Sequence, residues 1–97
     1  MKTVFIVYNQ ALMEKVMHIL DRLNIRGFTM WEDVQGRGSD KGEPHYGTHT
    51  WPAMNSATLT VVEEETVPAL LDMLKKLNSV SEKQGLRAFV WQVEETV

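Results

Sequence analysis

The chain has 97 residues, enough for one domain with a small core, because at this size only about two-thirds of the unfolded surface can be buried. Its 43% hydrophobic and 24% charged residues are ordinary for a globular protein, and the net charge of −3 argues against nucleic acid as a partner. It has no cysteine, which excludes disulfides, thiolate metal sites and cysteine nucleophiles. The first apolar run is too short for a signal peptide or membrane span, so we expect a cytoplasmic protein without membrane insertion.

The first half of the chain is predicted to form a strand, a helix and a second strand. Residues 3–8 (TVFIVY) are β-branched and aromatic, as strands are. Asn9 is suited to cap the next helix, which we expect Gly27 to terminate. The second strand is predicted over Phe28–Val34. Apolar residues of the helix recur at three- and four-residue spacing: Leu12, Val16, Ile19, Leu20 and Leu23.

The second half repeats this plan after a long polar loop. A third strand is predicted over 56–62, and a second helix starts at Thr66 or a neighbouring glutamate, with Pro68 in its first turn. A polar link over 78–85 leads to the last strand, 86–93. The second helix has its own apolar stripe: Val67, Leu70, Leu71, Leu74 and Leu77.

This order of elements predicts an α+β, ferredoxin-like βαββαβ fold in a single domain over 1–97. Its four-stranded antiparallel sheet carries two helices on one face, so the other face should be polar in a monomer. Instead, apolar residues occupy both faces, since Val4 and Ile6 alternate with Phe5 and Val7. Each such side chain that stays exposed loses the roughly 1.5–3 kcal/mol of stabilisation that its burial would give. We therefore expect a homo-oligomer whose sheets face each other; the alternative is a monomer with some exposed valines.

The loop over 35–52, QGRGSDKGEPHYGTHTWP, lies between the second and third strands. Loops of this length are usually functional or disordered. Its glycines, prolines, histidines and Arg37 suit contact with a ligand or a partner better than a simple connection. We expect binding to take place here.

Glu43, His45 and His49 on this loop form a candidate metal site. Imidazoles and carboxylates are good ligands for zinc or copper, and three ligands leave one coordination position open. The other reading is that both histidines are solvated. No phosphate-loop or HExxH motif is present, and we expect no enzymatic activity.

The run IRGFTMWEDVQGRGSDKGEPH resembles PII-type nitrogen regulatory proteins. In that family a glycine, a threonine on the second strand and a Val-x-Gly-x-Gly turn lead into the long T-loop. The matching residues are Gly27, Thr29, Val34, Gly36 and Gly38. The rest of the chain agrees in its order of elements, and the resemblance implies a homotrimer with its sheets packed inward.

The resemblance further implies that a small effector, such as an adenine nucleotide, binds in clefts between subunits. By position, the ligand-binding residues would be Thr29, Gly36, Arg37, Gly38 and Ser39, with Gly85 and Arg87 from the loop before the last strand. Glycines let backbone amides approach phosphates, and arginine offers a planar fork of donors. Read from the residues alone, Gly36 and Gly38 serve equally well as turn glycines.

Three hypotheses of function follow. The first is a PII-like signalling protein whose ligand changes the order of the 35–52 loop, which then engages a partner protein. The second is a divalent metal-binding or metal-tolerance protein that uses Glu43, His45 and His49. The third is a structural assembly module that binds nothing small.

Overall fold

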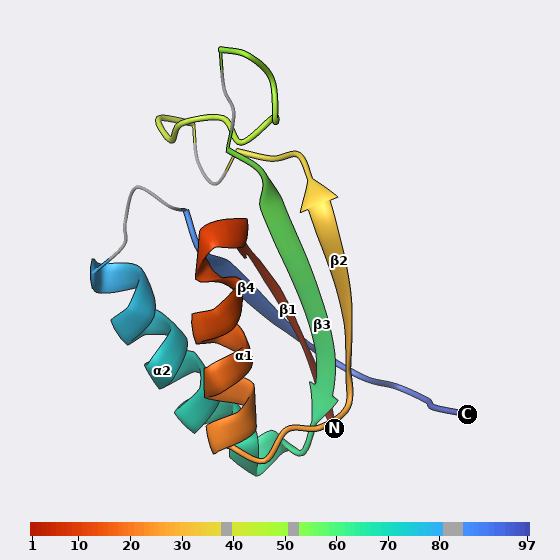
Figure 1. Cartoon of the computed structure of the whole chain (residues 1–97). Helices are drawn as coiled ribbons and strands as arrows, with labels where there is room; N and C mark the ends of the chain where they lie inside the picture. Colours follow the sequence, from red (N-terminus) through yellow and green to blue (C-terminus); the bar gives the residue numbers. More distant parts are fainter. Residues whose placement is uncertain (38–39, 51–52, 81–84) are drawn as a thin grey trace.

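The computed structural model describes residues 1–37, 40–50, 53–80 and 85–97. Within them, a four-stranded antiparallel sheet carries two helices on one face (Figure 1). The strands are β1 (Lys2–Asn9), β2 (Phe28–Val34), β3 (Asn55–Val62) and β4 (Arg87–Gln92), and their order across the sheet is β2-β3-β1-β4. The predicted ferredoxin-like arrangement is confirmed, with β2 and β4 at the two edges.

The first helix begins at the predicted cap. The Asn9 side chain accepts a hydrogen bond from the Ala11 amide (2.9 Å), which satisfies one of the free donors of the first turn. This turn, Gln10–Leu12, is a 3₁₀ helix named η1, and α1 (Met13–Arg22) continues from it. The predicted apolar stripe faces the sheet, with Leu12, Val16, Ile19 and Leu20 buried.

The end of α1 differs from the prediction. Asn24, with φ of 56°, takes the left-handed conformation, and the Ile25 amide donates to the Leu20 carbonyl at 2.8 Å. This six-residue closure is the hydrogen bond that ends many helices, and asparagine adopts it more readily than most residues. The prediction that Gly27 stops the helix was therefore wrong.

The second helix, α2 (Val67–Val80), follows the 3₁₀ turn η2 (Glu64–Thr66). It continues through three residues that we assigned to the polar link, 78–80. The Ser79 hydroxyl donates to the Lys76 carbonyl at 2.7 Å, so this polar side chain is satisfied within the helix itself. The remainder of the link up to Gly85, residues 81–84, lies outside the described residues.

The core lies between the helices and the sheet. Val4, Ile6 and Tyr8 of β1 point into it and are fully buried. They lie opposite Thr60, Thr58 and Ser56 of β3, so the third strand contributes hydroxyl groups to this face. The Tyr8 and Thr58 hydroxyls are 2.8 Å apart and hydrogen bonded. Burial raises the pKa of the Tyr8 phenol; the Thr58 hydrogen bond lowers it and the charge of Glu32 raises it further.

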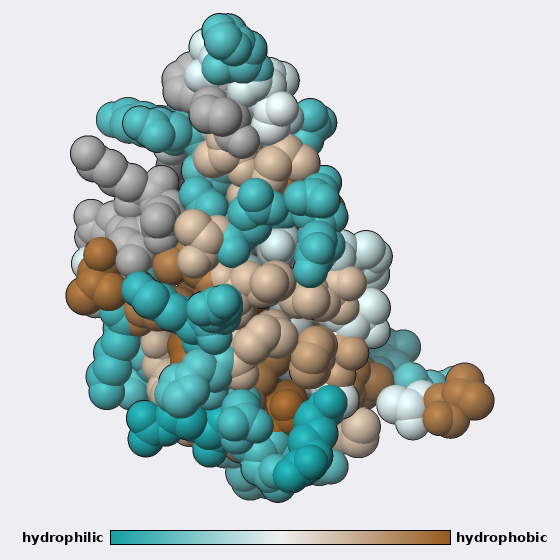
Figure 2. All heavy atoms as spheres, viewed as in Figure 1, coloured by the Kyte–Doolittle hydropathy of each residue, from teal (hydrophilic) through white to brown (hydrophobic). Residues whose placement is uncertain are grey.

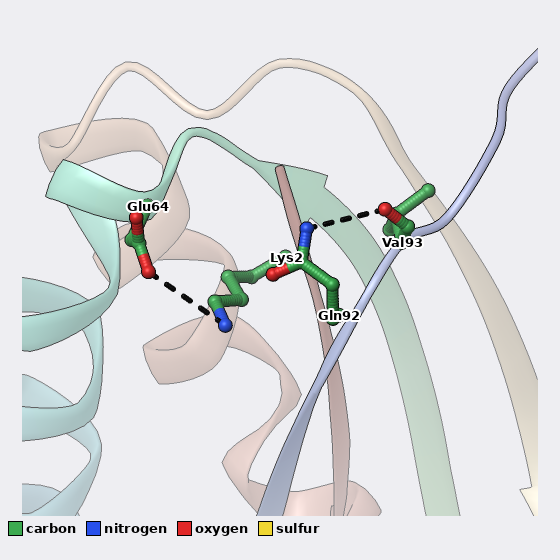
Figure 3. Close-up of polar contacts among 4 residues, drawn as sticks. All are labelled: Lys2, Glu64, Gln92 and Val93. Carbon is green, nitrogen blue, oxygen red and sulfur yellow. Dashed lines mark hydrogen bonds and ion pairs between the residues drawn. The ribbon is translucent and has the colours of Figure 1, made fainter.

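The outer side of the helices is polar: Figure 2, in the view of Figure 1, shows hydrophilic residues gathered over α2 and the end of the molecule below it. At that end, Nζ of Lys2 in β1 lies 3.7 Å from a Glu64 carboxylate oxygen of η2 (Figure 3). The Gln92 side chain donates to the Val93 carbonyl at 3.2 Å. Among the described residues, no helix is both long and apolar enough to cross a membrane.

The opposite face of the sheet, which we call the open face, is apolar and uncovered. It includes Thr29 and Trp31 of β2 and the alternate residues of the other strands, such as Phe5, Leu59 and Phe89. Phe89 is 53% exposed and Trp91 48%, although their neighbour Phe5 is partly buried. Apolar side chains on both faces of β1 confirm the alternation seen in the sequence.

Candidate functional site

The 35–52 loop is closed at its base by backbone pairing. The Gly36 amide donates to the His45 carbonyl at 3.0 Å, and the His45 amide donates to the Gly36 carbonyl at 2.7 Å. The Gln35 side-chain amide also donates to the Tyr46 carbonyl at 2.7 Å. These hydrogen bonds join the two arms of the loop where they leave the sheet.

His45 is part of this base. It is only 4% exposed, and its Nδ1 lies 2.6 Å from Oδ1 of Asn55, which is 2% exposed and begins β3. Because an amide oxygen can only accept, Nδ1 carries the proton. A Cβ atom at Gly36 would lie 2.8 Å from Nδ2 of Asn55, so any larger residue here would have to displace the Asn55 side chain. We call Gly36, His45 and Asn55 the loop clamp.

The second arm of the loop is paired with the chain that precedes β3. Gly47 has φ of 66°, and its amide donates to the Ala53 carbonyl at 2.9 Å. A Cβ atom at Gly47 would overlap Sδ of Met54. The Met54 carbonyl accepts from the Gln10 amide at 2.9 Å, which ties the loop to the start of the first helix.

The irregular end of β2 sets the direction in which the loop leaves the sheet. Trp31 pairs with Ala57 and Val34 with Asn55, so β2 contains an extra residue between these pairs. Asp33, in this bulge, has φ of 56°. A bulge bends the strand and increases its twist. It therefore changes the direction of the chain just before Gln35 and the loop clamp.

Two groups of the predicted ligand-binding residues lie at the same end of the sheet. Gly36 and Arg37 follow β2, and Gly85 and Arg87 stand at the start of β4, where Arg87 pairs with Val7. Both arginines are exposed. The edge strands β2 and β4 are separated by three strand spacings of about 4.8 Å each, so they lie roughly 14 Å apart at this end. Gly38 and Ser39 lie outside the described residues.

Thr29 lies near the other end of β2 and is exposed on the open face. It is ~7 residues from Gly36, which at about 3.3 Å per residue is roughly 20 Å. A single chain therefore does not bring Thr29 to the two arginines. A cleft that holds Thr29 and Arg37 together requires a second chain.

A cavity of about 350 Å³ lies on the open face, next to the loop base. Its walls are largely apolar and come from three strands and the start of the loop: Phe5, Val7, Trp31, Val34, Gln35 and Ala57. Sequence reasoning did not identify this cavity, although the alternation of apolar residues in β1 placed Phe5 and Val7 together on one face. The position of Trp31 beside them depends on strand pairing between residues far apart in the chain.

The predicted metal ligands are not gathered in this structure. Glu43 and His49 are exposed, whereas His45 is buried against Asn55. Across 1–37, 40–50, 53–80 and 85–97, no group of three or more His, Cys, Asp and Glu side chains is placed to hold a metal ion. The geometry instead gives His45 a structural role at the loop base.

Comparison with solved structures identifies PII-like proteins. CPII from Thiomonas intermedia K12, bound to ADP and bicarbonate, is 23% identical with a TM-score of 0.74, and the match covers 93% of this chain and 82% of that one. The same protein bound to ADP, AMP and acetate is 24% identical with a TM-score of 0.72, covering 97% and 88%. A structure from Thermus thermophilus, described as a PII-like signaling protein, is 25% identical with a TM-score of 0.68, covering 95% and 85%.

No curated protein sequence matches the chain. The family model described as nitrogen regulatory protein P-II, however, matches residues 1–97. The sheet order, the two helices on one face and the loop between β2 and β3 agree with this match. The chain therefore belongs to the nitrogen regulatory protein P-II family.

Proposed function

We propose that this protein is a non-enzymatic, PII-like regulatory protein of the cytoplasm that binds an adenine nucleotide in clefts between the subunits of a homotrimer. The observation that carries this proposal is the pair of exposed arginines, Arg37 and Arg87, at one end of the sheet beside an apolar cavity. Family membership supports the regulatory role.

The open face supports assembly. Phe89, Trp91 and Trp31 are each about half exposed, and burial of apolar surface is worth roughly 25 cal/mol per Å². An apolar sheet face of this kind marks an interaction surface. A neighbouring copy would also supply the Thr29 that one chain holds too far from Arg37.

The chemistry of the cleft suits an adenine nucleotide. The cavity walls, with Phe5, Val7 and Trp31, offer apolar contact to a flat base. Arginine forks at positions 37 and 87 would bind phosphate oxygens in pairs of hydrogen bonds. CPII, of similar fold, was solved with ADP and AMP bound, and we infer the same class of ligand here.

Signalling would pass through the 35–52 loop. Arg37 is next to Gly36, which pairs with His45 in the loop clamp. A ligand that contacts Arg37 would therefore favour one arrangement of the loop that this pair closes. A partner protein that reads this arrangement would then respond to the ligand. Zinc or copper has no comparable support, because Glu43 and His49 are not gathered around His45.

Native mass spectrometry with ADP, AMP and ATP tests the proposal. We expect a trimer that gains one nucleotide per chain, and an Arg37→Ala variant that binds it at least about tenfold more weakly. Arg22→Ala is the matched control, because Arg22 is an exposed arginine on α1, away from the cleft. A monomer, or a trimer that binds none of the three nucleotides, would reject the proposal.

A further inference from the structure

A second cavity, of about 230 Å³, lies between α2 and the start of β4, on the helix side of the sheet. From α2 it is lined by Leu71, Leu74, Lys75 and Asn78. These positions are three or four residues apart, so they share one face of the helix. Leu86 and Ala88 form the opposite wall.

The inner walls are apolar. Leu74 is 2% exposed and Leu86 is 4% exposed, while Leu71 is partly buried at the rim. The cavity is smaller than the roughly 300–1,000 Å³ of pockets that take drug-sized ligands. Its size and walls fit a short aliphatic chain.

The rim is cationic. Lys75 and Arg87 border the cavity, and the lining residues within 1–37, 40–50, 53–80 and 85–97 include no acidic side chain. The neighbouring Lys76 lies 3.1 Å from the Asp72 carboxylate. Lys75, in contrast, forms no ion pair with any residue in the described part of the chain. An ammonium group that has no carboxylate partner among the described residues, beside an apolar cavity, is complementary to an amphipathic anion.

We propose that this cavity binds a short-chain aliphatic carboxylate, of about six to eight carbons. The chain packs against Leu74, Leu86 and Ala88, and the carboxylate pairs with Lys75 at the rim, where Asn78 offers a further amide donor. The site lies on the helix side and is separate from the apolar cavity beside the loop base. The two cavities share no lining residue in the described part of the chain, and the experiments below leave unchanged Arg87, which the nucleotide proposal also uses.

The first experiment is a titration followed by ¹H–¹⁵N NMR, with octanoate, hexanoate, acetate and octylammonium as probes. Octanoate should shift the amide signals of Leu74, Leu86 and Ala88 and saturate them. Affinity should fall about three- to fourfold for each methylene removed, since each contributes about 0.8 kcal/mol. Acetate and octylammonium should cause no saturable shift at these amides, because one lacks the chain and the other the negative charge.

Variants then test whether Lys75 itself, and not the general positive charge of this surface, binds the carboxylate. Lys75→Ala should weaken octanoate binding about three- to tenfold, whereas the matched Lys76→Ala should change it less than about twofold. Leu71→Asp places a negative charge at the rim and should abolish binding, while its unchanged NMR spectrum elsewhere verifies folding. Arg87 is left intact because it also belongs to the proposed nucleotide cleft.

Three results would overturn the proposal. One is the absence of saturable shifts at Leu74, Leu86 and Ala88 with octanoate. Another is equal weakening by Lys75→Ala and Lys76→Ala, which would indicate nonspecific attraction. The third is equal binding of octylammonium, which would show an apolar pocket without selection for charge.

Discussion

Gly36 lies at the loop base, where its backbone passes close to the Asn55 side chain. Gly36→Ala would place a Cβ atom 2.8 Å from Nδ2 of Asn55, closer than real Cβ contacts allow. Asn55 must then move, which breaks its hydrogen bond with His45. We expect a loss of about 1–3 kcal/mol in the free energy of unfolding, measured by urea denaturation.

Gly27→Ala is the matched control for that substitution, since no described residue other than its chain neighbours places an atom within 4 Å of a Cβ atom at Gly27. Gly27→Ala should change the free energy of unfolding by no more than about 0.5 kcal/mol. If the two alanine variants lose equal stability, the close approach at Gly36 does not hold in solution.

The two loop histidines are expected to behave differently. His45→Ala removes the partner of a buried amide oxygen on Asn55, which should cost about 1–3 kcal/mol of unfolding free energy. His49 is exposed, so His49→Ala should change stability by no more than about 0.5 kcal/mol. Thermal and urea unfolding of the two variants, in metal-free buffer, compare them directly. Equal losses from both would argue against the loop clamp.

At the scale of elements, local patterns predicted most of the fold. The bounds of β2 are as predicted, because a run of strand-forming residues lies between Gly27 and the polar loop. The end of α1 was misplaced because the left-handed residue was an asparagine, Asn24, and glycine was the stronger signal. The loop clamp could not be predicted, since the pairing of Gly36 with His45 joins residues across the loop and leaves no local pattern.

The pairing of β1 with β3 also makes the stability of the folded state depend on pH in the alkaline range. Tyr8 is buried opposite Ser56 and bonded to Thr58, and burial raises its pKa above the ordinary value of 10.0. The folded state therefore holds the phenol proton more tightly than the unfolded chain does. The resulting stability is fully present below about pH 10 and is lost as the pH rises through the folded-state pKa.

Tyr8→Phe tests this dependence. At pH 8 the variant should be less stable than the wild type by about 1 kcal/mol, because the Thr58 hydroxyl loses its partner. At pH 11 this difference in the free energy of unfolding should be smaller. Only the wild type loses stability there, because its folded state keeps protonated a phenol that the unfolded chain ionises. Urea unfolding at both pH values measures the gap, and the lysines that titrate in this range are common to both proteins. A gap that stays constant would contradict a buried phenol.

At the scale of the whole molecule, the candidate cleft is divided between the two ends of β2. Gly36 and Arg37 lie at one end and Thr29 near the other, roughly 20 Å away. This separation follows from the length of the strand that they share, whose bounds the sequence predicted. If Thr29 and Arg37 contact the same nucleotide, they belong to different copies of the chain, so binding and assembly are coupled.

Phe89→Glu tests this coupling. Phe89 is 53% exposed on the open face, so glutamate is tolerated in a single chain but places like charges together when open faces pack against one another. We expect analytical ultracentrifugation to show a monomer. Nucleotide affinity should fall at least about tenfold, although Arg37 and Arg87 are unchanged.

Val80→Glu is the matched control, because Val80 is 79% exposed at the end of α2, on the helix side of the sheet. It introduces the same charge at an exposed apolar position and should leave the trimer and its nucleotide affinity unchanged. A Phe89→Glu monomer that binds nucleotide as tightly as the wild type would place the whole site within one chain. Thr29 would then have no part in it, and the two arginines with the apolar cavity beside the loop base would have to suffice.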